Sequence, residues 1–268
     1  MMKPKVEEPR GILLRRAGEK RFHLTRLPPA QDLSCFVERY WIVSWDLRGQ
    51  APYVQETLPY PCVNLVVEKN RSMIYGVETG KFARLLEGHG RVFGVKFKPG
   101  AFYPFFKAPV AQITNACISF QAALGVDSKA LEEALLTHED EGAMKEIVED
   151  FLRARLPKHD EHITEINRII DYIIAHQEIT RVDDVVEQLA LNKRTLQRLF
   201  NQYVGVGPKW VIKRYRLHEV AERLAAHAGG DCTKMAQDLG YFDQAHFIKD
   251  FKTIVGKTPV EYARDDRD

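Results

Sequence analysis

A run of basic side chains is the part of this sequence best suited to chemistry. Between Gln188 and His218 no acidic residue occurs. One-sided positive charge of this kind attracts a polyanion such as nucleic acid. Taken alone, the run also fits a solvated face balanced by acids from elsewhere, because the formal net charge of the 268-residue chain is only +2. The basic residues of the run are Lys193, Arg194, Arg198, Lys209, Lys213, Arg214 and Arg216.

No other residue set has the spacing of a catalytic or metal site. The sequence has no CxxC, HExxH or GxSxG motif and no phosphate-binding Walker loop. We therefore expect no catalytic residues, no metal and no cofactor. The chain also has no run of 18 apolar residues and no apolar leader at its start, so we expect no membrane span and a cytoplasmic location. The cysteines, expected to be buried and reduced, are Cys35, Cys62, Cys117 and Cys232.

A nine-residue phrase occurs twice near the C-terminal end. FNQYVGVGP at 200–208 returns as FKTIVGKTP at 251–259, with its Phe, Gly and Pro at the same places. Each copy ends a predicted helix, and a shorter predicted helix precedes it across a tight turn. Such a pair predicts a helix-turn-helix, whose second helix enters the major groove in DNA-binding versions. The predicted pairs are 181–190 with 192–204 and 231–239 with 243–255.

The elements around this repeat fall into two halves. Residues 20–115 contain short β-rich runs between Gly, Pro, Asn and Gln turns, which indicate a small antiparallel sheet or barrel. After residue 128 the apolar residues recur at helical intervals. The predicted strands lie at 40–47, 62–68, 72–78 and 91–100. The predicted helices lie at 129–136, 141–156, 163–176, 181–190, 191–205, 208–227, 231–240, 243–256 and 258–263.

The predicted fold class is α+β, with an antiparallel β domain followed by an all-α domain of two helix-turn-helix units joined by a long helix. The polar segment PKHDEH at 157–162 marks the boundary, so we expect a sensory domain at 1–128, connecting helices at 129–157 and a DNA-binding domain at 158–268. The connecting helices need a surface for their apolar residues, which either a second chain or the β domain would supply. Those residues are Leu131, Leu135, Ile147, Phe151 and Leu152.

The C-terminal half resembles the AraC/XylS-type transcription regulators over residues 163–264. The motifs that carry this resemblance are LNKRTLQRLF, GVGPKWVIKRYRLHEVAERLA and MAQDLGYFDQAHFIKDFKTIVGKTPVEYA. The chain departs from the family at Ala190, where glycine is usual, at Val186, where alanine is usual, and at Asn192, which replaces a serine cap. The resemblance implies sequence-specific binding to promoter DNA, contact with RNA polymerase, response to a small-molecule effector and the option of a homodimer.

The resemblance also assigns roles to individual residues. The positions that would face bases are Arg194, Gln197, Arg198, Gln244, Ala245, Ile248 and Lys249. The positions expected at phosphates are Lys193, Lys213, Arg214, His246 and Lys252.

The N-terminal half resembles, more loosely, the sensory domain of one branch of these regulators, through VERYW, LPYPCVNLVV and GVKFKPGAFYPFF. Trp45 and Tyr53 flank an apparent loop and are the residues we expect in an effector pocket. Two other functions stay open. One is a DNA alkylation-repair protein with a similar DNA-binding domain and a reactive cysteine, and the other is a protein-binding helical scaffold.

Overall fold

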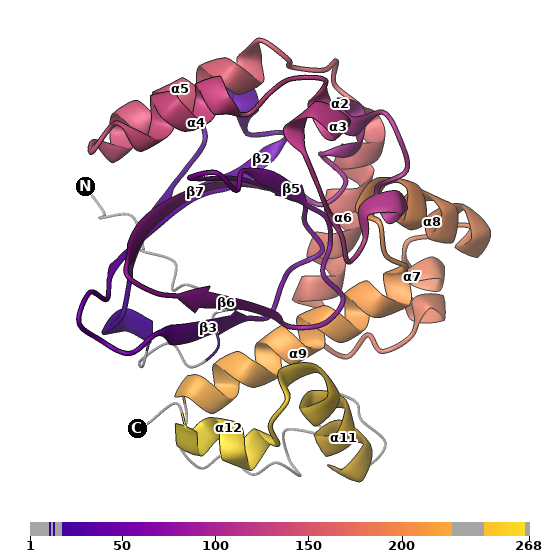
Figure 1. Ribbon diagram of the computed structural model, residues 1–268. Helices are drawn as coiled ribbons and strands as arrows, with labels where there is room; N and C mark the ends of the chain where they lie inside the picture. Colours follow the sequence, from indigo (N-terminus) through magenta and orange to yellow (C-terminus); the bar gives the residue numbers. More distant parts are fainter. Residues whose placement is uncertain (1–10, 12, 14–17, 227–243, 266–268) are drawn as a thin grey trace, which may run out of the picture.

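The computed structural model describes residues 11, 13, 18–226 and 244–265. It shows an antiparallel β domain followed by helices, so the predicted fold class is confirmed (Figure 1). The predicted helix at 231–240 lies outside the described residues.

The β domain consists of two facing antiparallel sheets (Figure 1). The larger has the strand order β1-β2-β7-β4-β5-β8, and the smaller pairs β3 with β6. The sequence analysis does not predict β1, β3 or β6. The strands are β1 His23–Leu27, β2 Val37–Asp46, β3 Tyr53–Thr57, β4 Asn64–Glu68, β5 Met73–Tyr75, β6 Phe82–Leu86, β7 His89–Phe97 and β8 Cys117–Ile118.

Alternation along β2 separates the two faces of the larger sheet. Tyr40 and Ile42 are buried, at 0% and 2% exposure, in the main core of the domain. Trp41 and Trp45 point to the other face, toward β3 and β6, because successive strand residues face opposite sides. The larger sheet therefore has one face packed under helices and one face turned to the interior of the domain.

The helices α4 Lys129–Leu136 and α5 Glu141–Arg153 cover the packed face of that sheet (Figure 1). Leu131, Leu135 and Leu152 belong to the core that they form with the strands, and Ile147 and Phe151 pack against it. Of the two surfaces considered for these apolar residues, a second chain or the β domain, the structure shows the β domain. Shorter elements complete the domain, namely η1 Gln31–Leu33, α2 Tyr103–Phe106, η2 Val110–Ile113 and α3 Phe120–Leu124.

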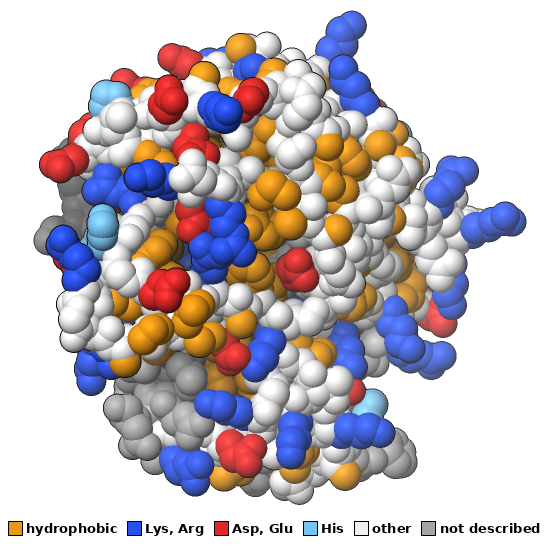
Figure 2. Space-filling model, in the orientation of Figure 1, with side chains coloured by type: hydrophobic (Ala, Val, Ile, Leu, Met, Phe, Trp, Pro, Cys, Tyr) orange, Lys and Arg blue, Asp and Glu red, His pale blue; other side chains and the backbone are white. Residues whose placement is uncertain are grey.

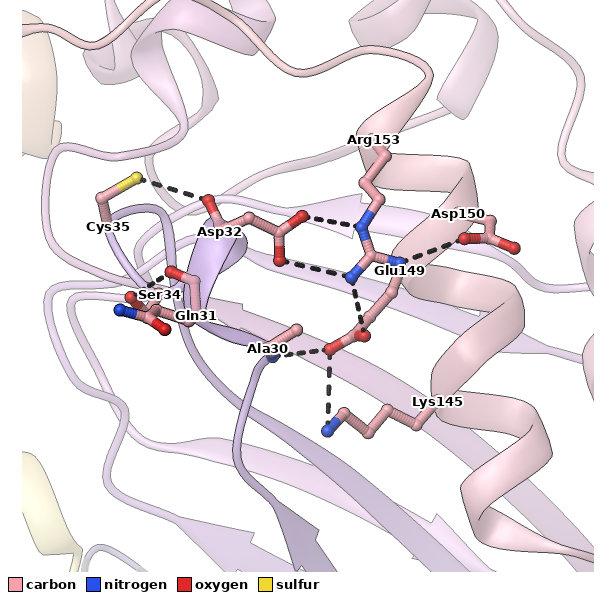
Figure 3. Close-up of polar contacts among 9 residues, drawn as sticks. All are labelled: Ala30, Gln31, Asp32, Ser34, Cys35, Lys145, Glu149, Asp150 and Arg153. Atoms are coloured by element: carbon pink, nitrogen blue, oxygen red, sulfur yellow. Dashed lines mark hydrogen bonds and ion pairs between the residues drawn. The ribbon is translucent and has the colours of Figure 1, made fainter.

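A buried carboxylate fixes α5 to the segment before β2 (Figure 3). Glu149 is 4% exposed and accepts a 2.8 Å hydrogen bond from the backbone N–H of Ala30. Arg153 and Lys145 approach the same carboxylate at 3.2 and 3.8 Å, and Arg153 also donates to Asp32 at 2.7 Å. Cations and a backbone donor compensate the burial of the charge, so this network has a structural role.

The C-terminal half is helical, and its core divides in two. One cluster joins α6 to η3 and the start of α9, and the other joins the end of α9 to α11 and α12. The elements are α6 Glu161–Ala175, α7 Val182–Gln188, α8 Lys193–Leu199, the π-helical turn η3 Phe200–Val204, α9 Pro208–Ala226, α11 Gln244–Val255 and α12 Pro259–Asp265.

The repeated phrase has the same structural role in both copies. Phe200 and Phe251 are completely buried, one in each cluster. Gly205 and Gly256 follow with φ angles of 91° and 84°, in the left-handed region that favours glycine at the end of a helix. The proline of each copy then opens the next helix, α9 or α12. Each copy of the repeat therefore supplies a buried aromatic residue, a glycine that ends one helix and a proline that begins the next.

Candidate nucleic-acid interface and effector cavity

The first candidate recognition helix is α8 Lys193–Leu199. The Asn192 side chain caps it by accepting a 3.0 Å hydrogen bond from the N–H of Thr195, as the sequence indicated. Leu196 and Leu199 turn inward, at 2% and 9% exposure. Lys and Arg side chains project from the edge of the molecule over α7 and α8 (Figure 2). The expected base-facing residues of this unit are all exposed, namely Arg194, Gln197 and Arg198.

The turn before α8 contains one strained residue. Ala190 has a φ of 52° in the position where glycine was expected. An L-residue with a side chain adopts this left-handed conformation at a cost of roughly 1–2 kcal/mol. The chain therefore keeps the geometry of the turn without the residue that favours it.

The second candidate recognition helix is α11 Gln244–Val255. Phe247 and Phe251 anchor it, each at 0% exposure. Gln244, Ala245 and Lys249 are exposed on its outer side. Ile248 differs from the other expected base-facing residues, because it is half-buried and packs against the core of this unit. The polar surface of α11 is therefore smaller than that of α8.

Two of the expected phosphate contacts are engaged with Asp250 of α11. Lys213 of α9 lies 2.8 Å from one Asp250 oxygen, and His246 lies 3.8 Å from the other. Lys193 likewise pairs with Asp183 of α7 at 2.6 Å, but about half of its side chain stays exposed. Lys252 is exposed on α11.

Arg214 does not lie where the sequence suggested, so its assignment to phosphate is wrong for this conformation. The residue is 1% exposed and donates to the backbone carbonyls of Thr79 and Gly80 in the β domain, at 2.5 and 3.2 Å. Burial lowers the pKa of its guanidinium to about 10. The reason is helical periodicity, since Arg214 shares a face of α9 with the fully buried Val211 and Leu217.

A cavity of about 270 Å³ lies between the two sheets of the β domain. Its walls include Trp41, Val43 and Trp45 of β2 together with Phe82 of β6. Figure 2 shows basic and hydrophobic side chains side by side over the space between the sheets. A mostly apolar cavity with a few charged groups is typical of small-molecule sites.

One of the two expected pocket residues lines this cavity. Trp45 does, whereas Tyr53 is not among the lining residues, although its cross-strand partner Leu86 is. The sequence analysis missed Arg39, which alternates with the tryptophans on β2, and Lys96, which is only 7% exposed. The sequence did contain a signal for Arg39. It lies two positions before Trp41, so the period-two pattern of β2 places both side chains on the same face.

Both missed cations contact Glu38. Its Oε1 atom lies 2.6 Å from Arg39 and 3.0 Å from Lys96. Burial raises the pKa of the Glu38 carboxyl, but the two cations outweigh it and hold that pKa below its usual range. Burial also raises the pKa of the neighbouring Cys62 thiol to about 12, which makes this cysteine a poor nucleophile.

Two further properties concern only the described part of the chain. None of its helices is long and apolar enough to cross a membrane. Among the same residues, no three His, Cys, Asp or Glu side chains form a group that could hold a metal ion.

Comparisons with known proteins place both halves of the chain. Residues 25–119 match the model of a domain of unknown function (DUF6597), and residues 185–265 match that of a helix-turn-helix domain. The chain is 35% identical over 77 residues to the transcriptional activator RhaS of Escherichia coli O139:H28, covering 29% of this chain and 27% of RhaS. It is 28% identical over 102 residues to the regulatory protein PocR of Salmonella typhimurium, covering 38% of this chain and 33% of PocR.

Among solved structures, fatty-acid-bound ToxT of Vibrio cholerae aligns with 98% of this chain and 97% of its own, at 13% identity and a TM-score of 0.40. The chain spans about a third or less of the length of the curated relatives it matches. The residues that match the helix-turn-helix model, 185–265, include both copies of the repeated phrase and the helices α8 and α11. Residues 185–265 therefore form a helix-turn-helix domain of the AraC/XylS type, as the sequence resemblance implied.

Proposed function

We propose that this chain is a sequence-specific DNA-binding transcription regulator that responds to a small molecule through its N-terminal domain. One observation carries the proposal. The two copies of the repeat present Arg198 and Lys249 at matching positions, both exposed, while the phenylalanines beside them are buried. Long cationic side chains on a helix of this kind read base edges in the major groove.

The length of α9 supports engagement of both helices by one monomer. The helix has 19 residues, which corresponds to roughly 28 Å at 1.5 Å per residue. With the offset of each recognition helix from its ends, the separation approaches the roughly 34 Å of one DNA turn. Arg194, Gln197 and Arg198 would then face bases in one groove, and Gln244, Ala245 and Lys249 in the next. Lys252 and Lys193 would contact phosphates.

The cavity between the sheets is the proposed effector site. It shares the wall residue Tyr60 with the cleft between the β domain and α9. A ligand there would lie one side chain away from the helix that connects the two units. Acting in the cytoplasm at a promoter, such a regulator would also contact RNA polymerase, and it would act as a monomer or a homodimer.

The test is a footprint of the purified full chain on fragmented genomic DNA, followed by binding titrations on the recovered sites. We expect discrete sites bound at least ~10³-fold more tightly than unrelated DNA at the same salt concentration. Binding without sequence preference would contradict the proposal. A methylated duplex in the same assay addresses the repair alternative, because transfer of the alkyl group to a cysteine would be seen as an added mass.

A further inference from the structure

The floor of the cavity is made of two tryptophans that lie across glycines of the neighbouring strand. Trp41 is opposite Gly94 and Trp45 is opposite Gly90 in the β2–β7 register. A Cβ at Gly94 would lie 1.9 Å from Trp41, and one at Gly90 would lie 2.4 Å from Trp45. Each indole therefore occupies the space that a side chain would need, and lies flat on the sheet.

Hydrogen bonds fix the orientation of both rings. The Nε1 of Trp41 donates to the Oδ1 of Asn64 at 3.4 Å, and the Nε1 of Trp45 donates to the carbonyl of Glu87 at 3.0 Å. With one face of each ring against a glycine, the other face is turned to the cavity that both residues line. This is a preformed surface for stacking a planar group.

Cations stand at one end of this floor. Lys96 is beside Asn64 in the register of β4 with β7 and beside Arg39 in that of β2 with β7. Both cations line the cavity, Arg39 also lines the cleft on the other side, and the Glu38 carboxylate that they share lines only that cleft. The positive charges of Lys96 and Arg39 are thus balanced by the single negative charge of Glu38. One net positive charge remains at the cavity wall.

The remaining charges on the cavity wall do not cancel this excess. Arg84 is paired with Glu68, so these two offset each other. Arg26 adds another cation to the wall, and Glu78 adds a carboxylate. Burial alone raises the pKa of Glu78, so no cation contributes to its shift. An anionic group therefore has its favourable position beside Lys96 and Arg39.

Tyr60 connects that position to the DNA-binding half. The Lys96 ammonium lies 3.8 Å from the centre of the Tyr60 ring, and the His218 ring of α9 stacks on it at 3.9 Å with an angle of 9° between the planes. Both groups cannot occupy one face at these distances, so Tyr60 is held between them. A displacement of Lys96 would therefore reach α9 through one side chain, the ring of Tyr60.

We propose that the cavity binds a small planar aromatic anion, with its ring on Trp41 and Trp45 and its anionic group between Lys96 and Arg39. The coupling of this ligand to α9 rests on the proposed regulatory function. When the ligand draws the Lys96 ammonium toward itself, Lys96 leaves the Tyr60 ring. The stacking of Tyr60 on His218 then weakens, and the position of α9 relative to the β domain changes.

Calorimetric titration of the full chain without DNA tests the ligand class. The probes are indole-3-carboxylate, its neutral carboxamide, cyclohexanecarboxylate and octanoate. We expect the aromatic carboxylate to bind about tenfold or more tightly than the carboxamide, because a charge-assisted hydrogen bond is lost in the neutral probe. It should also exceed both saturated acids. Equal binding of acid and amide, stronger binding of octanoate, or binding of no probe would overturn the ligand class.

Variants locate the site. Gly94→Ala should abolish binding because its Cβ displaces the Trp41 indole, whereas Gly80→Ala, whose Cβ meets nothing within 4 Å, should bind normally. Lys96→Gln should bind acid and amide alike, and Lys96→Arg should restore the preference. If Gly94→Ala binds as well as the wild type, the floor is wrongly assigned. The comparison of probes on the wild type stays decisive if a variant fails to fold.

Coupling is measured as the change in operator affinity on adding indole-3-carboxylate. We expect a change of several-fold in the wild type and in Tyr60→Phe, which retains the ring. Tyr60→Leu should show no change in operator affinity at probe concentrations that saturate its own cavity. A full response in Tyr60→Leu would overturn the relay alone. Loss of operator binding without any probe would instead contradict the regulatory function.

Discussion

The two helix-turn-helix units share a scaffold and differ in their surroundings. The first is fastened to the β domain, because Thr114 donates a 2.7 Å hydrogen bond to the carbonyl of Gly205 and Gln202 donates one of 2.6 Å to the Tyr103 hydroxyl. At the second, a Cβ on Gly256 would meet only the flexible side chain of Lys81. The repeat thus preserves the fold of the unit, while each copy has its own contacts.

Their outer surfaces differ as well. On α8, Arg194, Gln197 and Arg198 are all exposed and polar, whereas α11 offers Gln244 and Lys249 beside apolar neighbours. Arg reads guanine and Gln reads adenine, so the first unit has the richer set of base-reading groups. We therefore expect an asymmetric operator with its more strongly specified half at α8.

The largest expected effect comes from changing the spacing of the two half-sites. Inserting half a DNA turn between them rotates one groove to the opposite side of the duplex, and a 19-residue helix cannot follow. We expect affinity to fall on the order of 100-fold in a binding titration. Insertion of a full turn serves as the control for length. Unchanged affinity after the half-turn insertion would contradict simultaneous engagement.

The same substitution in both copies should separate their surroundings. Gly205→Ala combines a φ of 91° with a Cβ placed 2.9 Å from Thr114 and 3.2 Å from the backbone of Val110. Gly256→Ala introduces only the backbone strain of a positive φ, without a close contact to backbone atoms. We expect losses of roughly 2–3 and about 1 kcal/mol in the free energy of unfolding, measured by denaturant titration. Equal losses would show that the first unit is not fastened as described.

Ala190→Gly should remove the strain at the first turn. Glycine accepts a φ of 52° freely but loses more chain entropy on folding, so the net gain should be about 0.5–1 kcal/mol. Denaturant titration measures it, with Ala175→Gly at the last residue of α6 as a control that relieves no strain and should give no gain in stability. A loss of stability at position 190 would refute the assignment of strain.

The sequence predicted the scaffold better than the surface. The repeated Phe, Gly and Pro have local roles, so spacing alone revealed both units, and most helices lie within a few residues of their predicted ranges. Strands β1, β3 and β6 escaped because each buries at most one side chain, so their sequences carry little apolar pattern. Arg214 was misplaced because a count of charges ignores which face of a helix each one occupies. The domain boundary at 157/158 stays a prediction.

The smallest expected effect concerns Lys252. As a phosphate contact it should bind all sequences alike, so Lys252→Ala should weaken affinity uniformly and reduce the slope of log affinity against log salt by about 1. Lys193→Ala is the matched comparison, expected to change the slope less because Lys193 is already paired with Asp183. A sequence-dependent loss in Lys252→Ala would move this residue to the base-reading set.

The most direct test of the central claim is a binding titration of Arg198→Ala and Lys249→Ala against operators altered at single base pairs in each half-site. We expect each variant to lose about 1–3 kcal/mol of binding free energy and to become indifferent to base changes in its own half only. The two sets of affected base pairs should lie about one helical turn apart. If both substitutions relax the same base pairs, or neither relaxes any, the two-groove account is contradicted.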